Sequence, residues 1–585
     1  MKRKFFYAVL FAFSAELVFA ASPRNEKELI QPDSWVYDSL TALAVENGRV
    51  DFSDDAPLTV GQIRILMKAY DYDSLSESSK NHYDKINAYF DEQNISFSAG
   101  IFSLGIALET NLEGYYKGNA NLPWIYDRNS RKEFLLVPAT FDIGDYLTMQ
   151  TNLSFAQSKG WMQHNDNYVN APFPIQSFDV NFPSYGYIST GINLPKDCQV
   201  NLRLGLGEQS IGRTLMGSII MSEYFTGASW VNLEFFSPNL KYELNVTEFN
   251  VDKYLYSHRI DVQFFNKIHF SAMEGILVHA PFELRFLNPW TIYHGMAPWL
   301  DYSGETYTDS DTCAYMCFKV AYTPVKYLRL YGLFAQDQFQ TAYEIEHWPN
   351  DTTPNAIGFQ AGVESFIPFK GGNFHIAAEG SYAEPFLYVK EDPNWSLVRT
   401  YRENMGDLAT FYEWLGSPFG PDTVAGQLSV GYEYSDRWNV NMNYLFKAAG
   451  EYSGTKVFTR ELSWGGHDTE ADHSGPGGTI THWAFPNAND PDQGLAEAKR
   501  RQALKAPSGI PEYLNMISVN GSYKFNDYLS LFMQGGFIFA FNYNNILDNF
   551  QCGPEFAMSL KFDITKLYRN LMDKPKKIQA DPTED

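Results

Sequence analysis

The 585-residue sequence has little cysteine, no long apolar run beyond its first residues, and fewer basic than acidic residues. Four cysteines are too few for a disulfide scaffold in a chain of this length. Cys313 and Cys317 would lie about 13 Å apart along an extended strand, so they can pair only if a turn separates them. No cysteine–histidine spacing suggests a zinc site.

The shortage of basic residues narrows the range of ligands. With 45 Lys and Arg against 69 Asp and Glu, the formal net charge is −24. Nucleic-acid binding requires a basic surface, so this balance argues against it. A broadly anionic ligand would need locally focused basic residues or a bridging cation, so the balance favours a neutral or cation-bridged ligand.

The first 20 residues have the features of a secretory signal peptide. Lys2, Arg3 and Lys4 precede an apolar stretch, and Val18-Phe19-Ala20 is typical of a cleavage site after Ala20. A membrane anchor is the alternative, which we disfavour because the apolar stretch is shorter than the ~20 residues of a spanning helix.

Aromatic residues are abundant, at 16% of the chain, and apolar residues alternate with polar ones in many segments. In Cys198–Leu206 the odd-even alternation is strict: Leu202 and Leu204 fall on one face, Asn201 and Arg203 on the other. These features predict a mainly β protein, a large antiparallel transmembrane β-barrel of about 16 to 18 strands over residues 96–563. A soluble secreted β protein is the alternative, because the same alternation can also face a core.

Residues 21–95 have helical signals instead. Ser34 is placed to cap a helix, Thr59 and Gln62 form a capping box, and Ser74 with Glu77 is a second such pair. A helical domain this small is expected to dock on the barrel as a periplasmic cap or plug. Residues 564–585 are predicted to be a charged periplasmic tail.

Long polar segments between predicted strands are expected to be extracellular loops whose Trp and Tyr side chains either stack on sugars or stiffen the loops. One loop contains possible metal ligands, which are better explained as solvated residues: His467, Asp472, His473 and His482. No nucleophile motif is present, and the acids that could include a glycosidase pair are more simply lumen-facing residues: Glu379, Glu384, Glu403 and Glu413. The sequence therefore predicts no enzyme, no cofactor and no metal site.

Three stretches together resemble the capsule-assembly Wzi family of outer-membrane proteins. The first joins Asp33–Leu40, Asn47–Val50 and Pro57–Thr59, the second is Gly212–Ser222, and the third joins His258–Val262, Ala272–Gly275 and Arg285–Pro289. The resemblance implies a large monomeric barrel with a helical bundle at its periplasmic mouth. It also implies a non-enzymatic, lectin-like role in holding exported polysaccharide at the cell surface.

The resemblance also implies site residues. Arg213, Glu274, Arg285 and Asn288 would lie in the lumen or its mouth, and Arg285 would hydrogen-bond a carboxylate in a forked geometry. Three aromatic residues would stack on sugars: Trp290, Tyr293 and Trp299. The alternative for the charged residues is a structural one, in which Glu274 pairs with an arginine across the lumen.

These observations predict an outer-membrane protein that binds surface or capsular polysaccharide. Its other expected partners are outer-membrane lipid and the barrel-insertion machinery. Two further functions remain open, a porin or solute channel on the same architecture and, as a weaker alternative, a hydrolase acting on glycans or lipids.

Overall fold

A computed structural model describes residues 18–19, 23–92, 95–158, 168–174, 177, 185–293, 312–347, 354–389, 396–404, 408–454, 456–459, 499–500 and 502–572. Most of the predicted signal peptide lies outside these residues. So do Trp299, the loop with His467, Asp472, His473 and His482, and the last 13 residues, 573–585.

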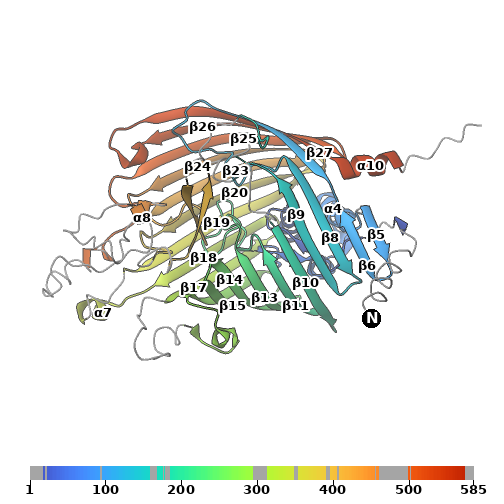
Figure 1. The fold of residues 1–585 in the computed structure, drawn as a ribbon, viewed down its shortest axis with the longest axis horizontal. Coiled ribbons are helices and arrows are strands. Elements are labelled where there is room, and N and C mark those ends of the chain that lie inside the picture. Colours follow the sequence, from blue (N-terminus) through green and yellow to red (C-terminus); the bar gives the residue numbers. More distant parts are fainter. Residues whose placement is uncertain are drawn as a thin grey trace, which may run out of the picture.

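The described chain forms a closed antiparallel barrel of 18 strands, as the sequence predicts (Figure 1). Its strands are β6 (Phe102–Ile106) and β7 (Glu109–Lys117), which together occupy one position, and then β8 (Leu135–Ile143), β9 (Leu147–Phe155), β10 (Tyr185–Leu194), β11 (Cys198–Leu206), β13 (Ser229–Phe236), β14 (Leu240–Asn250), β15 (Lys253–Phe264), β16 (Ile268–His279), β17 (Thr312–Val325), β18 (Leu328–Gln338), β19 (Ala356–Phe369), β20 (Gly372–Ala383), β23 (Thr423–Tyr434), β24 (Trp438–Ala449), β25 (Glu512–Asn526), β26 (Leu529–Phe541) and β27 (Gln551–Asp563).

The barrel closes where its last strand meets its first. β27 pairs with β7 from Glu555↔Lys117 to Asp563↔Glu109, and β8 pairs with both β7 and β6. β5 (Ile95–Ala99) adds to β6, and the short β1 (Val18–Phe19) pairs with β5. Closure satisfies the backbone hydrogen bonds of a membrane-spanning sheet.

The alternation predicted for Cys198–Leu206 separates lipid from lumen in β11. Leu202 and Leu204 are half exposed on the outer surface, whereas Asn201 and Arg203 are buried on the inner one. The same period of two recurs in β27, where Phe556, Met558 and Leu560 are partly exposed outward. The outer surface therefore carries the apolar belt of an outer-membrane barrel.

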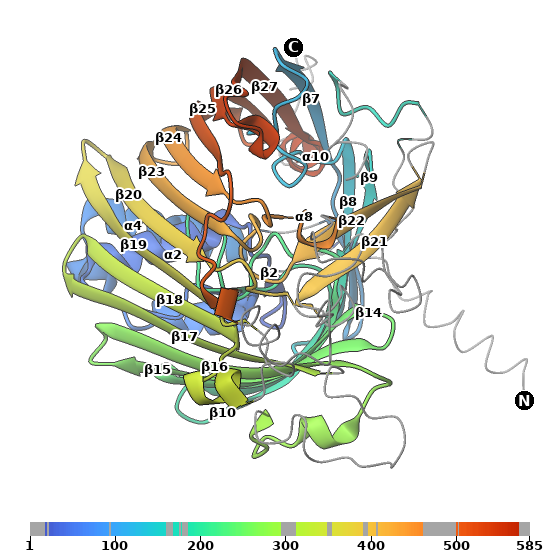
Figure 2. The same cartoon turned by 90° about the vertical axis from the view of Figure 1, so that its left-hand side faces the viewer.

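The two ends of the barrel differ in their connections. β13 and β14, β15 and β16, β17 and β18, and β25 and β26 are joined by short turns at one end, and the longer connections lie at the other. Short turns are periplasmic and long loops extracellular in barrels of this class. Figure 2 views the ring of strands from the end with the long loops.

In the described part of the chain, three α-helices precede the barrel: α2 (Trp35–Glu46), α3 (Val60–Met67) and α4 (Glu77–Phe90). Ser34 caps α2, and the predicted capping box of Thr59 and Gln62 is present on α3. The predicted cap of the third helix is wrong: Ser76 accepts from the Ser79 amide, whereas Ser74 ends a 3-10 turn, η1 (Tyr72–Ser74). Among the described residues, no helix is both long and apolar enough to cross a membrane.

These helices and the segments around them, residues 23–92, form a plug in the periplasmic half of the lumen. Their core packs against an inward aromatic of the wall, Phe236. The plug also touches periplasmic turns, since the Val50 amide donates to Asn266 O (3.0 Å) and the Tyr327 amide donates to Val45 O (2.8 Å). Two short antiparallel strand pairs complete the plug. Within it, β2 (Leu29–Ile30) pairs with β4 (Leu58–Thr59), and β3 (Asp55–Ala56) pairs with β12 (Ser210–Ile211) of the connection after β11.

Several smaller elements differ from the sequence-based expectation. The segment predicted as a charged tail begins with a helix, α10 (Ile564–Met572). The loop at 391–421 contains a hairpin, β21 (Val398–Asn404) and β22 (Leu408–Trp414). Short helical turns complete the described chain: η3 (Leu284–Leu287), α7 (Ala342–His347), α8 (Lys456–Thr459) and η4 (Tyr543–Asn545). Cys313 and Cys317 both lie in strand β17, with no turn between them, and their side chains are buried.

Candidate functional site: the plugged lumen

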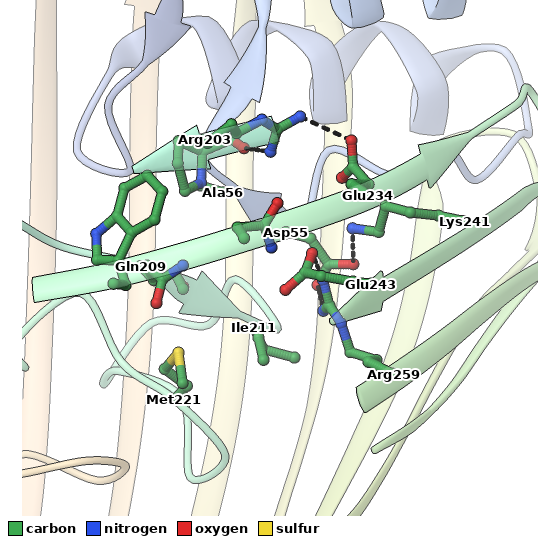
Figure 3. Close-up of a pocket in the computed structure, with 14 residues that line it drawn as sticks. Asp55, Ala56, Arg203, Gln209, Ile211, Met221, Glu234, Lys241, Glu243 and Arg259 are labelled. Atoms are coloured by element: carbon green, nitrogen blue, oxygen red, sulfur yellow. Dashed lines mark hydrogen bonds and ion pairs between the residues drawn. The ribbon is translucent and has the colours of Figure 1, made fainter. Parts of the chain in front are cut away.

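The plug is held to the barrel wall by a buried network of ion pairs around Asp54 and Asp55. Figure 3 shows the part of it in which Asp55 lies beside Lys241 and Arg259. Lys319 Nζ on β17 lies 2.6 Å from Asp55 Oδ1 and 3.0 Å from Asp54 Oδ1. Asp55 also pairs with Lys241 on β14 (3.1 Å) and with Arg259 on β15 (3.1 Å). Two adjacent plug carboxylates thus contact cations from three wall strands.

The network continues along the wall on both sides of Asp54. Arg329 on β18 pairs with Asp54 (3.2 Å), and His269 on β16 lies 3.0 Å from Asp54 and 3.1 Å from Asp261. Arg329 also pairs with Glu364 on β19. All these groups are buried, so each charge depends on its partners for stability.

The electrostatics of the two plug carboxyls follow from this geometry. Burial alone would raise their pKa values, but Lys319 and His269 hold the pKa of Asp54 below its ordinary value. Arg259, Lys241 and Lys319 likewise hold the pKa of Asp55 well below it. Both carboxylates are therefore charged in the docked plug.

Asp54, Asp55 and His269 have ligand atoms within 4.8 Å of one another, the one such group among the described residues. The same carboxylate oxygens already contact Lys319, Lys241, Arg259 and Arg329. A divalent cation would add charge to a site that four cationic side chains already fill. This geometry fits an ion-pair lock rather than a metal centre.

A second polar cluster joins the plug to β11 and β13. Arg203 NH2 lies 2.7 Å from Glu234 and donates to Gln62 Oε1 (2.8 Å), and the Gln62 amide also donates to Glu234. The capping box that starts α3 thereby places Gln62 against the wall. One residue serves both the local helix and the docking of the plug.

An apolar core fills part of the outer half of the lumen. The connection between β11 and β13 turns inward at Gly217, which has a φ of +87°. Ile219, Ile220 and Met221 are fully buried there. Tyr315 Oη donates to Ile220 O (2.7 Å) and so ties this connection to β17.

A cavity of about 1720 Å³ remains beside the plug. It is lined by α4, by strands β7–β9 and β24–β27, and by the hairpin β21–β22. At the hairpin, the buried Glu413 accepts from Thr226 Oγ1 (2.8 Å) and pairs with Arg399 (3.2 Å) and Arg128 (3.6 Å). The lumen is thus partly open inside, with a salt-bridged hairpin beside the cavity.

The acids considered as a catalytic pair have structural partners. Glu379 accepts from the Leu215 and Met216 amides (2.8 and 3.1 Å), and Glu384 pairs with Lys505 (2.6 Å). Glu413 holds the hairpin, and the side chain of Glu403 lies outside the described ones.

The structure places Arg213 inside the lumen. Its guanidinium pairs with Asp38 on α2, lies 5.9 Å from the Tyr37 ring centroid, and donates to Pro32 O (3.4 Å). Arg213 therefore links the inward connection to the plug. Whether it contacts a ligand stays a prediction.

Glu274 faces the opposite way from the predicted direction. On β16 the inward residues are His269, Ser271 and Met273, so the period of two turns Glu274 outward with Phe270. Among the described contacts it pairs with His258, whose Nε2 lies 3.0 Å away on the neighbouring strand β15.

Four predicted residues belong to the connection after β16, which lies against the outer wall (Figure 2). Tyr293 stacks on His258 with 4.8 Å between ring centroids, and Tyr242 Oη on β14 donates to Pro289 O (3.0 Å). Arg285 pairs with Glu283, and Asn288 Oδ1 accepts from the Trp290 amide (3.2 Å). Arg213 is therefore separated from Glu274, Arg285, Asn288, Trp290 and Tyr293 by the barrel wall.

Sequence reasoning missed the network around Asp54 and Asp55, although one signal was available. In strands whose polar and apolar residues alternate, the side that faces the lumen includes three basic residues, Lys241, Arg259 and Lys319. A basic side chain buried at such a position requires an acidic partner, and the adjacent aspartates Asp54 and Asp55 in the plug could have been recognised as that partner.

Neither a family model nor a curated protein matches this sequence. Among solved structures, the chain is similar to Wzi of Escherichia coli, described as an outer membrane protein involved in group 1 capsule assembly and a carbohydrate-binding β-barrel. The identity is 11% and the TM-score 0.52, over 91% of this chain and 99% of that one. OprD of Pseudomonas aeruginosa has a TM-score of 0.34 and 10% identity, over 78% of this chain and 94% of that one. The first similarity shows a common fold.

We expect Asp55→Asn to release the plug. The substitution removes one carboxylate partner from each of the buried cations Lys241, Lys319 and Arg259, at a cost of about 3 to 5 kcal/mol. Amide hydrogen exchange of α2 to α4 should become much faster. Asp38→Asn is the control, because its carboxylate is largely exposed and its loss should change exchange little. Equal protection in both variants would contradict the lock.

The depressed pKa values predict that mild acid leaves the plug docked. A group with a lowered folded-state pKa contributes full stability above its unfolded pKa and loses it only as the pH falls through the folded value. Burial lowers the pKa of His82 on α4 to about 4, which acts the other way: at pH 5 His82 takes up a proton only when the helix opens, so acid lowers the stability of the docked state through this residue. In a His82→Gln variant, which removes this effect, the protection factors of α2 to α4 should be equal at pH 7 and pH 5, and a marked fall at pH 5 in that variant would contradict the prediction for the two aspartates.

Proposed function

We propose that this outer-membrane barrel binds and retains surface polysaccharide at its extracellular end without catalysing a reaction. The observation that carries the proposal is the double closure of the lumen. Ion pairs fix the plug in the periplasmic half, and an apolar core fills part of the outer half. A lumen built in this way favours retention at the surface over free passage. The fold shared with a carbohydrate-binding barrel is consistent with this role.

The described extracellular connections supply an aromatic side chain for such a ligand. Trp290 is 89% exposed on the connection after β16, whereas Tyr293 on the same connection is buried against His258. An exposed indole offers an apolar face and a hydrogen-bond donor to a sugar ring. With a net charge of −24, the protein favours a neutral or cation-bridged polysaccharide. The proposal includes a monomer that reaches the membrane through the barrel-insertion machinery.

A solute channel is the second candidate, and the cavity of about 1720 Å³ is the observation that favours it. The cavity runs beside the plug to the hairpin β21–β22, and its lining carries side chains of both charges. Passage would require the hairpin to move, which the ion pairs of Glu413 oppose.

We expect saturable binding of the purified protein to the producing organism's surface polysaccharide. Trp290→Ala should weaken it about fivefold, equivalent to about 1 kcal/mol for one aromatic contact. Phe265→Ala is the matched control, since Phe265 is 88% exposed in a periplasmic turn. Absence of saturable binding, or equal weakening by both substitutions, would contradict the proposal.

For the channel, Glu413→Gln removes the charge that holds Arg399 and Arg128. If the hairpin gates a path, planar-bilayer conductance should rise in this variant and stay low in the unmodified protein. Glu109→Gln removes a cavity charge without touching the hairpin and should leave conductance unchanged. If the unmodified protein and both variants show no conductance in planar bilayers, the channel function is contradicted.

A further inference from the structure

The helix α10 directly follows the last barrel strand, at the periplasmic end (Figure 1). Its nine residues, Ile564–Met572, are more strongly amphipathic than those of the plug helices. Polar and apolar side chains separate onto opposite sides because each residue turns the helix by about 100°.

The polar side of α10 faces the lumen. Thr565, Lys566, Arg569 and Asn570 line the cavity beside the plug. Lys566 Nζ lies 2.9 Å and Arg569 NH2 3.8 Å from Glu92, which follows α4. Both cationic side chains therefore hold the plug.

The opposite side consists of Ile564, Leu567, Tyr568 and Leu571, spaced three and four residues apart. Tyr568 is 43% exposed and Leu571 58% exposed. An apolar stripe of this kind on a short helix requires a surface to cover it.

The preceding strand indicates which surface that is. On β27, Lys561 and Asp563 line the lumen cavity, while Met558 and Leu560 are partly exposed on the lipid-facing side. The polar side of α10 continues the lumen side of β27. Its apolar side is therefore continuous with the lipid-facing belt at the periplasmic boundary of the membrane.

We propose that α10 is an interfacial membrane anchor that places Tyr568 and Leu571 in the phospholipids of the periplasmic leaflet. Tyrosine suits this position because its ring is apolar and its hydroxyl reaches water. Since Lys566 and Arg569 are paired with Glu92, binding depends on apolar burial more than on anionic headgroups. The helix thereby fixes the plug to the membrane as well as to the barrel.

Site-directed spin labelling of the full-length protein tests this proposal. Cys198→Ser and Cys552→Ser remove the two cysteines that are not buried, and Leu571→Cys then carries a nitroxide on the apolar side. Asn570→Cys is the matched control, one residue away, exposed, and on the lumen side. The proteins are reconstituted in vesicles of phosphatidylethanolamine and phosphatidylglycerol.

Two paramagnetic reagents are compared: oxygen, which concentrates in lipid, and a water-soluble nickel complex. The ratio of the collision rate with oxygen to that with the nickel complex should be several-fold higher for the label at position 571 than for the label at position 570. Tyr568→Cys should behave like Leu571→Cys. Equal access of the nickel complex to positions 570 and 571 would overturn the proposal. So would a label at position 571 that neither reagent reaches, since that would show a protein contact.

Discussion

The rest of the structure depends on the pairing of Asp54 and Asp55 with cations of the barrel wall. Lys241, Arg259 and Lys319 face the lumen from three strands and are buried. Without the plug, Lys319 would lose its contacts with Asp54 and Asp55, and Lys241 and Arg259 would depend on the wall acids Asp261 and Glu243 alone. A buried charge with too few partners is among the most costly arrangements in a folded protein. The wall therefore requires the plug as much as the plug requires the wall.

This pairing also determines where the lumen is empty. The network draws the plug toward β14–β18, and the cavity lies against β7–β9 and β24–β27 on the far side. Links on the cavity side are fewer, such as Lys85 with Glu433 (2.7 Å) and Lys566 with Glu92 (2.9 Å). One side of the barrel is thus fixed to the plug by ion pairs and the other side borders the cavity, so both polysaccharide retention and solute passage can be tested on this structure.

Short-range patterns in the sequence predicted much of this fold. The period of two over Cys198–Leu206 separated lipid from lumen, and the box of Thr59 and Gln62 began a helix where expected. Long-range features were not predictable in the same way. The meeting of Asp55 with Lys319 joins residues 264 positions apart, and the inward and outward sides of β16 depend on a register that motif resemblance does not supply. The amphipathic pattern of α10 was present in the sequence, but the charged residues after it obscured the helix.

The outward direction of Glu274 changes what the connection after β16 does. An ionisable pair on the outer wall of a barrel is costly when lipid surrounds it. His258 and Glu274 have side chains only 18% and 22% exposed, since Tyr293 stacks on His258 and Phe286 packs on Tyr256 nearby. The connection thus shields a polar pair on the outer wall. Tyr293 is committed to this contact, whereas Trp290 is 89% exposed, more than the other exposed aromatic of the described part of the connection, Phe282, at 48%.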